Sequence, residues 1–276
     1  MDLQTKYQIF CDGNFLMIDG DALPYMFGWV HRTHTEVTEM DRALDSWFED
    51  LKLLSGAKTY VGVLAHPEAQ CFRIEEYKFK RYKGSRTDKE QDPGMAFWMP
   101  YVKGILLEKY GFIHAPQHVE TDDVIAYLGT ELSIESPDGY IGWMASPDKD
   151  MKQIAGYHLD YRKMIDGGGI KNEIITKDQA TLHWCMQMLC GDSTDTIAGI
   201  PGTGEKKAAD LLAKGTPFTW RAQVQEAYQK YFGSYYGDII YDETYAAVTL
   251  MHPGNKYWSV HSYPLESYLC SVHQFK

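Results

Sequence analysis

Short apolar runs alternate with longer segments of helical periodicity over the first 150 residues. Four runs rich in β-forming residues predict strands at residues 15–19, 59–65, 111–115 and 140–146. Between these runs, apolar residues at helical spacing predict helices over residues 38–54 and 119–132. Because strands that alternate with helices usually form a parallel sheet, we predict an α/β fold with a mostly parallel central sheet flanked by helices.

The pattern becomes helical after about residue 175. Residues 176–191 open with a capping box formed by Thr176 and Gln179, continue as an apolar helix and stop at Gly191. Further helices are predicted at residues 206–215, 220–232 and 242–251. We therefore predict an α/β domain over residues 1–175 and a helical region over residues 176–276.

The composition is typical of a well-packed globular protein, with 44% hydrophobic and 14% aromatic residues in a chain of 276. No stretch approaches the roughly 20 apolar residues that cross a bilayer. The N-terminus lacks the basic and apolar regions of a secretory signal. The five cysteines form no C-x-x-C pair, which favours reduced thiols. These features predict a cytoplasmic protein with no membrane partner.

The net charge of −11 does not exclude a nucleic-acid partner, because net charge hides how charge is distributed. Residues 73–89 are locally basic and include Tyr77, Phe79 and Tyr82. The acidic surplus lies partly in short clusters of Asp and Glu. If these clusters bind metal ions, much of their charge is neutralised.

Acidic residues end or follow three of the predicted strands. They are Asp19 after the first strand, Glu120, Asp122 and Asp123 after the third, and Asp148 and Asp150 after the fourth. Each group alone is typical of an ordinary turn or of the first turn of a helix. Their coincidence at the carboxyl ends of parallel strands predicts one shared site. Such a cluster requires cations, and all-oxygen ligands suit Mg²⁺ or Mn²⁺ rather than zinc.

A Gly-rich segment at residues 191–212 lies between two predicted helices. It is not a P-loop, because Glu205 stands where the lysine is required, and it is not a dinucleotide fingerprint, because Lys207 stands where the third glycine is required. Backbone N–H groups near a helix start, with lysines beside them, suit a phosphodiester backbone gripped without base reading.

Three segments together resemble the 5′-nuclease superfamily: VETDD (residues 119–123), SPDKD (residues 146–150) and the Gly-rich segment. This superfamily includes bacteriophage flap endonucleases, 5′→3′ exonucleases and the nuclease domain of bacterial DNA polymerase I. The residues that match its helix–three-turn–helix pattern, here at residues 182–213, are Gly191, Asp192, Asp195, Ile197, Gly199, Gly202, Gly204, Lys206, Ala208, Leu211 and Leu212. The resemblance runs from Asp19 to Leu212, and the last sixty or so residues carry no motif.

The resemblance implies two sites for divalent metal ions. Their ligands, direct or through water, would be Asp19, Glu120, Asp122, Asp148 and Asp150, with Asp123 in the same cluster and with Asp192 and Asp195 completing the second site. It also implies K⁺ bound by backbone carbonyl groups at Thr196, Ile197 and Ile200.

The resemblance further implies contacts to DNA. The segment near residues 73–95 matches a basic arch, in which Lys83 and Arg86 approach the scissile phosphate and Tyr82 stacks on a terminal base. Without the other motifs, these residues would indicate a solvated charged helix. The catalytic residues implied are Lys83, Arg86, Asp148 and Asp150. The DNA contacts implied are Arg73, Tyr82, Lys83, Arg86, Gly202, Gly204, Lys206 and Lys207.

Two positions depart from the family pattern. An aspartate that usually follows the second strand is absent, so either Glu68, or less readily His66, takes its place, or that ligand is missing. Pro147 stands where a small polar residue is commoner, although a turn after a strand tolerates proline.

The implied activity is metal-dependent hydrolysis of a phosphodiester bond near a DNA 5′ end, giving a 5′-phosphate and a 3′-hydroxyl. The substrate would be flap, nicked or duplex DNA, or an RNA/DNA hybrid, in replication or primer removal. The motifs do not separate a flap endonuclease from a 5′→3′ exonuclease. A non-catalytic DNA-binding protein of the same fold is the alternative from another class. A PIN-type ribonuclease would lack the segment after Gly191.

Overall fold

A mixed sheet forms the centre of the structure, a computed structural model that describes residues 15–33, 36–85, 92–134, 142–162, 164, 171–252 and 273–274. Its strands are β1 (Phe15–Asp19), β2 (Thr59–Leu64), β3 (Ile113–His114), β4 (Gly142–Ala145), β5 (Gly156–Asp160), β6 (Lys171–Ile175) and β9 (His273–Gln274). The order β3-β2-β1-β4-β5 is parallel throughout, whereas β6 and β9 pair antiparallel with β5 and β2. The predicted α/β fold with a mostly parallel sheet is therefore confirmed.

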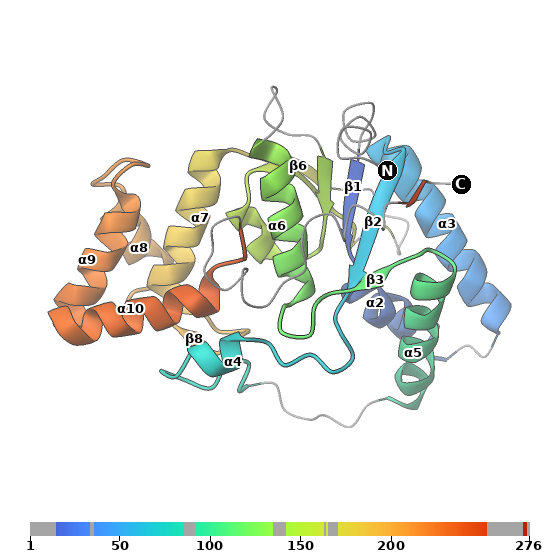
Figure 1. Ribbon diagram of the computed structural model, residues 1–276, viewed down its shortest axis with the longest axis horizontal. Coiled ribbons are helices and arrows are strands. Elements are labelled where there is room, and N and C mark those ends of the chain that lie inside the picture. Colours follow the sequence, from blue (N-terminus) through green and yellow to red (C-terminus); the bar gives the residue numbers. More distant parts are fainter. Residues whose placement is uncertain are drawn as a thin grey trace.

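Helices flank both sides of the sheet (Figure 1). Those that the structure describes up to residue 153 are α2 (Ala22–His31), α3 (Val37–Ser55), α4 (Arg73–Glu76), α5 (Pro93–Glu108), α6 (Thr121–Ile134) and the 3-10 helix η1 (Lys149–Gln153). All residues of β1 and β2 are buried, because helices cover the sheet at its centre. Gly62 on β2 makes room for this packing, since a Cβ there would lie 2.4 Å from the ring of Phe112.

The helical region follows β6 along the chain. It consists of α7 (Lys177–Cys190), the short strands β7 (Gly191–Asp192) and β8 (Ile197–Ala198), α8 (Glu205–Leu212), α9 (Trp220–Phe232) and α10 (Ser234–Val248). The predicted capping box is present, with Thr176 Oγ1 accepting from the Gln179 amide and the Gln179 side chain accepting from the Thr176 amide. Met188 and Tyr228 share one hydrophobic cluster with Met17 of the sheet, so the helices pack directly on the α/β part.

Several elements escape the hydrophobic pattern. Helices α2 and α5 and strands β5 and β6 were not predicted, and α10 begins at Ser234 rather than at residue 242. Helix α5 nevertheless has a recognisable start, because the side chain of Asp92 accepts from the amides of Gly94 and Met95 and proline follows at the first position. None of the helices within the described ranges is both long and apolar enough to span a membrane.

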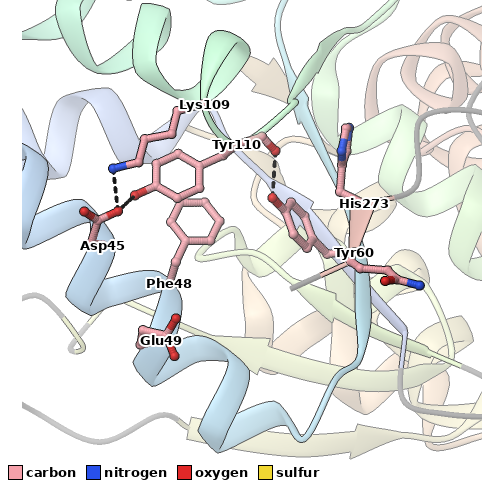
Figure 2. Close-up of a pocket in the computed structure, with 8 residues that line it drawn as sticks. Asp45, Phe48, Glu49, Tyr60, Lys109, Tyr110 and His273 are labelled. Atoms are coloured by element: carbon pink, nitrogen blue, oxygen red, sulfur yellow. Dashed lines mark hydrogen bonds and ion pairs between the residues drawn. The ribbon is translucent and has the colours of Figure 1, made fainter. Parts of the chain in front are cut away.

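Strand β9 lies against the start of β2, beside a pocket of about 210 Å³ between α3 and the end of α5 (Figure 2). The polar groups in this pocket bind one another. Tyr60 Oη donates to the carbonyl oxygen of Tyr110 (2.7 Å), while Tyr110 Oη (2.5 Å) and Lys109 Nζ (2.6 Å) both contact Asp45 Oδ1. This pocket lies at the amino-terminal start of β2, whereas the predicted acidic site lies at the carboxyl ends of the strands.

Candidate active site

Asp19 and Asp148 are joined through one serine. Ser146 Oγ donates to Asp19 Oδ2 (2.8 Å) and accepts from the amide of Asp148 (3.0 Å), so it links the ends of the neighbouring strands β1 and β4. Asp148 then caps η1 by accepting from the amide of Asp150 (2.8 Å). Burial and the neighbouring carboxylate of Asp21 raise the pKa of Asp19 to about 7.

Asp150 and Asp192 come from η1 and from β7, and two residues hold them. Gln187 Nε2 on α7 donates to Asp150 Oδ1 (2.5 Å), and Lys149 Nζ lies 2.7 Å from Asp192 Oδ2. Burial, together with the charges of Asp148 and Asp192, raises the pKa of Asp150 to about 7. Burial opposes ionisation of Asp192 as well, but the bond from Lys149 outweighs it and lowers the pKa of Asp192.

Glu120 precedes α6 and has four side-chain partners. Its oxygens accept from Arg73 Nη1 (3.0 Å), Tyr82 Oη (2.8 Å) and Lys83 Nζ. Cys71 Sγ donates to the same carboxylate at 3.3 Å. Although burial opposes ionisation, Arg73 and Lys83 lower the pKa of Glu120 to about 2.

Asp122 and Asp123 begin α6 and differ in their partners. Asp123 is completely buried, and its two oxygens accept a bidentate pair of hydrogen bonds from Arg73 (2.6 and 2.7 Å). Burial and the charges of Asp123 and Glu120 raise the pKa of Asp122 well above its ordinary value. Single oxygens of these three acids lie within 4.8 Å of one another, close enough to share a metal ion.

A small hollow brings together acids from three elements and from one turn. Its lining includes Asp122 of α6, Asp150 of η1, Asp192 of β7 and Asp195 of the following turn. Asp195 also lies near the basic segment, with Oδ2 at 3.9 Å from Lys83 Nζ and 3.3 Å from Tyr82 Oη. The structure therefore brings acids that are up to 73 residues apart in the sequence to one edge of the sheet.

Close backbone packing sets the position of Asp192 and Asp195. Gly191 has a φ of +74°, and a Cβ there would lie 2.3 Å from the amide nitrogen of Gly199. The basic segment binds the same turn, because the amide of Lys83 donates to the carbonyl oxygen of Asp195 (2.7 Å). Lys83 and Thr196 both have positive φ values, of 53° and 61°, which is uncommon for such residues. Arg86 lies outside the described residues.

A wider cavity of about 590 Å³ borders the Gly-rich turn. The residues around it include Thr196, Ile197, Ile200, Gly202 and Gly204, together with Lys80 of the basic segment. Lys206 and Lys207 are exposed at the start of α8, and Lys207 Nζ donates to the carbonyl oxygen of Gly202 (2.7 Å). Residues predicted to bind K⁺ and DNA therefore lie around one cavity.

Two predicted DNA contacts need correction. The side chain of Arg73 is 2% exposed, and its guanidinium binds acids and backbone carbonyl groups inside the protein. Tyr82 is 7% exposed and directs its hydroxyl to Glu120 and Asp195, so its ring is not free to stack on a base. Both side chains instead hold acidic residues of the site, Arg73 binding Glu120 and Asp123 and Tyr82 binding Glu120 and Asp195.

The replacement of the missing aspartate by Glu68 or His66 stays a prediction. Glu68 is exposed, and neither Glu68 nor His66 lines the acidic hollow. The side chains that bind the acids and were not predicted include Cys71, Ser146, Lys149 and Gln187. Ser146 and Lys149 lie within the SPDKD motif, which could have pointed to them, whereas Gln187 carries no local signal.

Comparisons with known proteins agree with the motifs. No family model matches the chain. DNA polymerase I of Bacillus subtilis is 32% identical over 143 residues, 49% of this chain and 16% of that protein. The 5′-3′ exonuclease of Aquifex aeolicus is 30% identical over 48% of this chain and 45% of its own length. The flap endonuclease Xni of Shewanella amazonensis is 28% identical over 71% of this chain and 76% of its own. The chain thus covers less than half of the first two relatives.

Solved structures share the fold. The bacteriophage T5 D15 flap endonuclease, determined with DNA and metal ions, has a TM-score of 0.59 and 16% identity over 85% of this chain and 89% of that chain. Flap endonuclease-1 from Methanococcus jannaschii has a TM-score of 0.51 and 13% identity over 95% and 92% of the two chains. The chain shares the fold of these two flap endonucleases, and the resemblance to the 5′-nuclease superfamily is confirmed.

Proposed function

We propose that the chain is a divalent-metal-dependent 5′-nuclease, which hydrolyses phosphodiester bonds near the 5′ ends of DNA. The observation that carries this proposal is the acidic hollow, in which carboxylates of α6, η1, β7 and the following turn meet. A non-catalytic DNA-binding protein has no use for so many repelling charges in one place. The names of the nuclease relatives support the same activity.

The acids of this site suit Mg²⁺ or Mn²⁺. Their donor atoms are all carboxylate oxygens, which hard divalent cations prefer. Burial together with neighbouring carboxylates raises the pKa of Asp19 and of Asp150 to about 7, so a bound cation would favour their ionised forms. The residues that would hold two ions are Asp19, Glu120, Asp122, Asp148, Asp150, Asp192 and Asp195, with Asp123 holding Arg73 beneath them.

Bound divalent ions would supply an activated water and would stabilise the attacking and leaving oxygens at phosphorus. The residues of the chain supply the rest. Lys83 is held between Glu120 and Asp195, where its ammonium group can offset the charge that develops on the phosphate. Ser146 binds both the carboxylate of Asp19 and the backbone amide of Asp148, and so fixes the distance between them. Arg86 would assist at the phosphate.

The Gly-rich turn would hold the DNA duplex. The residues around its cavity offer backbone groups of Gly202 and Gly204, and exposed lysines follow at Lys206 and Lys207. Contacts of this kind bind phosphates and carry little base specificity. A K⁺ ion held by carbonyl groups at Thr196, Ile197 and Ile200 would also help to bind the phosphates of the duplex. Flap, nicked and duplex DNA all offer the required 5′ end, and both flap endonuclease and 5′→3′ exonuclease activity use this arrangement.

A cleavage assay tests the proposal. The protein is incubated with 5′-labelled flap, nicked duplex, single-stranded DNA and an RNA/DNA hybrid, with Mg²⁺ or with a chelator. Asp148→Ala should lower the rate at least about 100-fold, because a carboxylate of the metal site is lost. Asp50→Ala, which removes an exposed acid on α3, is the matched control and should leave the rate unchanged. If Mg²⁺ releases no 5′ products, or if Asp148→Ala cleaves normally, the proposal is wrong.

A further inference from the structure

The last residues of α10 and those that follow it form one wall of the acidic hollow. Ala247, Val248 and Leu250 line this hollow beside Asp122, Asp150 and Asp192. The segment is deeply buried, with exposures of 3% for Ala247, 6% for Val248, 3% for Leu250 and 0% for Met251. No motif of the sequence falls here, yet hydrogen bonds link the segment to Asp150 through two glutamines and to Glu120 through an arginine.

The first set of contacts reaches Asp150. Gln153, the last residue of η1, donates from Nε2 to the carbonyl oxygen of Val248 (2.9 Å) and accepts from the amide of Leu250 (3.2 Å). The same Nε2 donates to Gln187 Oε1 (2.7 Å), and Gln187 Nε2 donates to Asp150 Oδ1 (2.5 Å). These hydrogen bonds fix the orientation of the side-chain amides of Gln153 and Gln187, which connect the wall to the Asp150 carboxylate.

The second set of contacts reaches Glu120. Arg73 Nε donates to the carbonyl oxygen of Ala247 (3.0 Å), and Nη2 donates to that of Thr249 (3.0 Å). The other side of the same guanidinium binds Glu120 Oε2 (3.0 Å) and Asp123. Asp123 Oδ1 also accepts from the amide of Met251 (3.0 Å). Because a guanidinium is planar and rigid, the wall sets where the Glu120 carboxylate lies.

We infer that residues 247–251 position the two carboxylate groups of the site relative to each other, with Gln153 and Gln187 acting on Asp150 and Arg73 acting on Glu120. The inference rests on the proposed function, and it assigns these three side chains as positioning residues. Sites for metal ions depend on such outer contacts, whose loss typically lowers metal affinity about 10- to 100-fold. The helical region beyond the Gly-rich turn is then part of the active site.

Gln153→Met gives the sharpest test, because Gln153 contacts no carboxylate of the hollow in the hydrogen bonds described above. Gln187→Met is the second variant, which removes the donor to Asp150 itself. Tyr60→Phe is the matched control, since it removes a buried hydrogen bond (2.7 Å) at the far end of β2 (Figure 2). For each protein, Mn²⁺ binding is measured by titration calorimetry without DNA, the Mg²⁺ concentration for half-maximal cleavage is determined, and the melting temperature is recorded.

Both glutamine variants should bind Mn²⁺ about 10-fold more weakly and require correspondingly more Mg²⁺, while Tyr60→Phe lowers only the melting temperature. Normal Mn²⁺ affinity in both glutamine variants, with melting temperatures lowered as in Tyr60→Phe, would overturn the inference and leave the proposed function intact. A wild-type protein that neither binds Mn²⁺ nor cleaves DNA would instead overturn the proposed function, and the inference with it.

Discussion

Glu120 and Asp150 belong to the same acidic site, but their surroundings differ in charge. Glu120 lies among Arg73, Lys83 and the hydroxyl of Tyr82, and its pKa is lowered to about 2. Asp150 has burial, Asp148 and Asp192 as its main influences, and its pKa is raised to about 7. The protein's own cations therefore stabilise the ionised form of Glu120, whereas ionised Asp150 carries an unfavourable charge.

This difference indicates that the carboxylates of the site have different roles. Side chains from residues 71–83 hold Glu120 in place before any ligand arrives. Asp19 and Asp150, in contrast, gain most from a bound cation, because burial disfavours their ionised forms. We expect loss of a cationic side chain beside Glu120 to destabilise the folded state. We expect loss of the Asp19 or Asp150 carboxylate to stabilise the folded state and to weaken metal binding.

Arg73→Met should have the largest effect on stability. The substitution leaves Asp123 buried without its bidentate partner and removes the donors to Ala247 and Thr249. Breaking a buried ion pair in this way typically costs about 3–5 kcal/mol. Urea denaturation measures the loss. Arg162→Met is the control, because the side chain of Arg162 is 61% exposed and its pair with Asp160 is worth less than about 1 kcal/mol. Equal losses in the two variants would contradict the structural role of Arg73.

A pair of neutralising substitutions tests the comparison directly. Glu120→Gln should lower the free energy of unfolding by about 2 kcal/mol, because Arg73 and Lys83 lose a charged partner. Asp150→Asn should raise it by about 1–2 kcal/mol in chelator, because a disfavoured buried charge disappears. The amide oxygen of Asn can still accept from Gln187, so the hydrogen bond is kept.

The pH dependence of stability tests whether Asp150→Asn raises the free energy of unfolding. The pKa of Asp150 is raised above its ordinary value of 3.8 to about 7, so the folded state holds its proton more tightly than the unfolded state. The wild type therefore loses stability as pH rises from about 4 to 7, and the advantage of Asp150→Asn grows over that range and stays constant above it. Thermal denaturation in chelator from pH 4 to 8 measures this. A destabilised Asp150→Asn at pH 8 would contradict the comparison.

The acidic site could be predicted from the sequence because the carboxyl ends of parallel strands lie at the same edge of a sheet. Asp19, Asp148 and the acids at the start of α6 could therefore be assigned to that edge from periodicity alone. The glycines of the Gly-rich turn were equally readable, since Gly191 packs against the backbone of Gly199. In both cases local geometry decides the outcome.

The roles of Arg73 and Gln187 could not be predicted in this way. Arg73 lies in a basic segment and was expected to contact DNA, but its partners Ala247 and Thr249 are more than 170 residues away in the sequence. Gln187 is one polar residue on a helix whose neighbours are set by tertiary packing. Helix α5 was missed because its apolar residues are not confined to one face and Pro100 interrupts the pattern.

Ser146→Ala should have the smallest effect. The substitution removes the donor to Asp19 Oδ2 and the acceptor for the Asp148 amide, which lowers the free energy of unfolding by about 1 kcal/mol. Ser55→Ala is a matched control, because Ser55 is also buried and also uses its hydroxyl twice, with Leu51 and Ala57. Both variants should melt at similar temperatures, but only Ser146→Ala should bind Mn²⁺ more weakly, since only Ser146 orients a carboxylate of the site. Equal Mn²⁺ affinities in the two variants would show that the β1–β4 corner needs no serine to hold its acids in place.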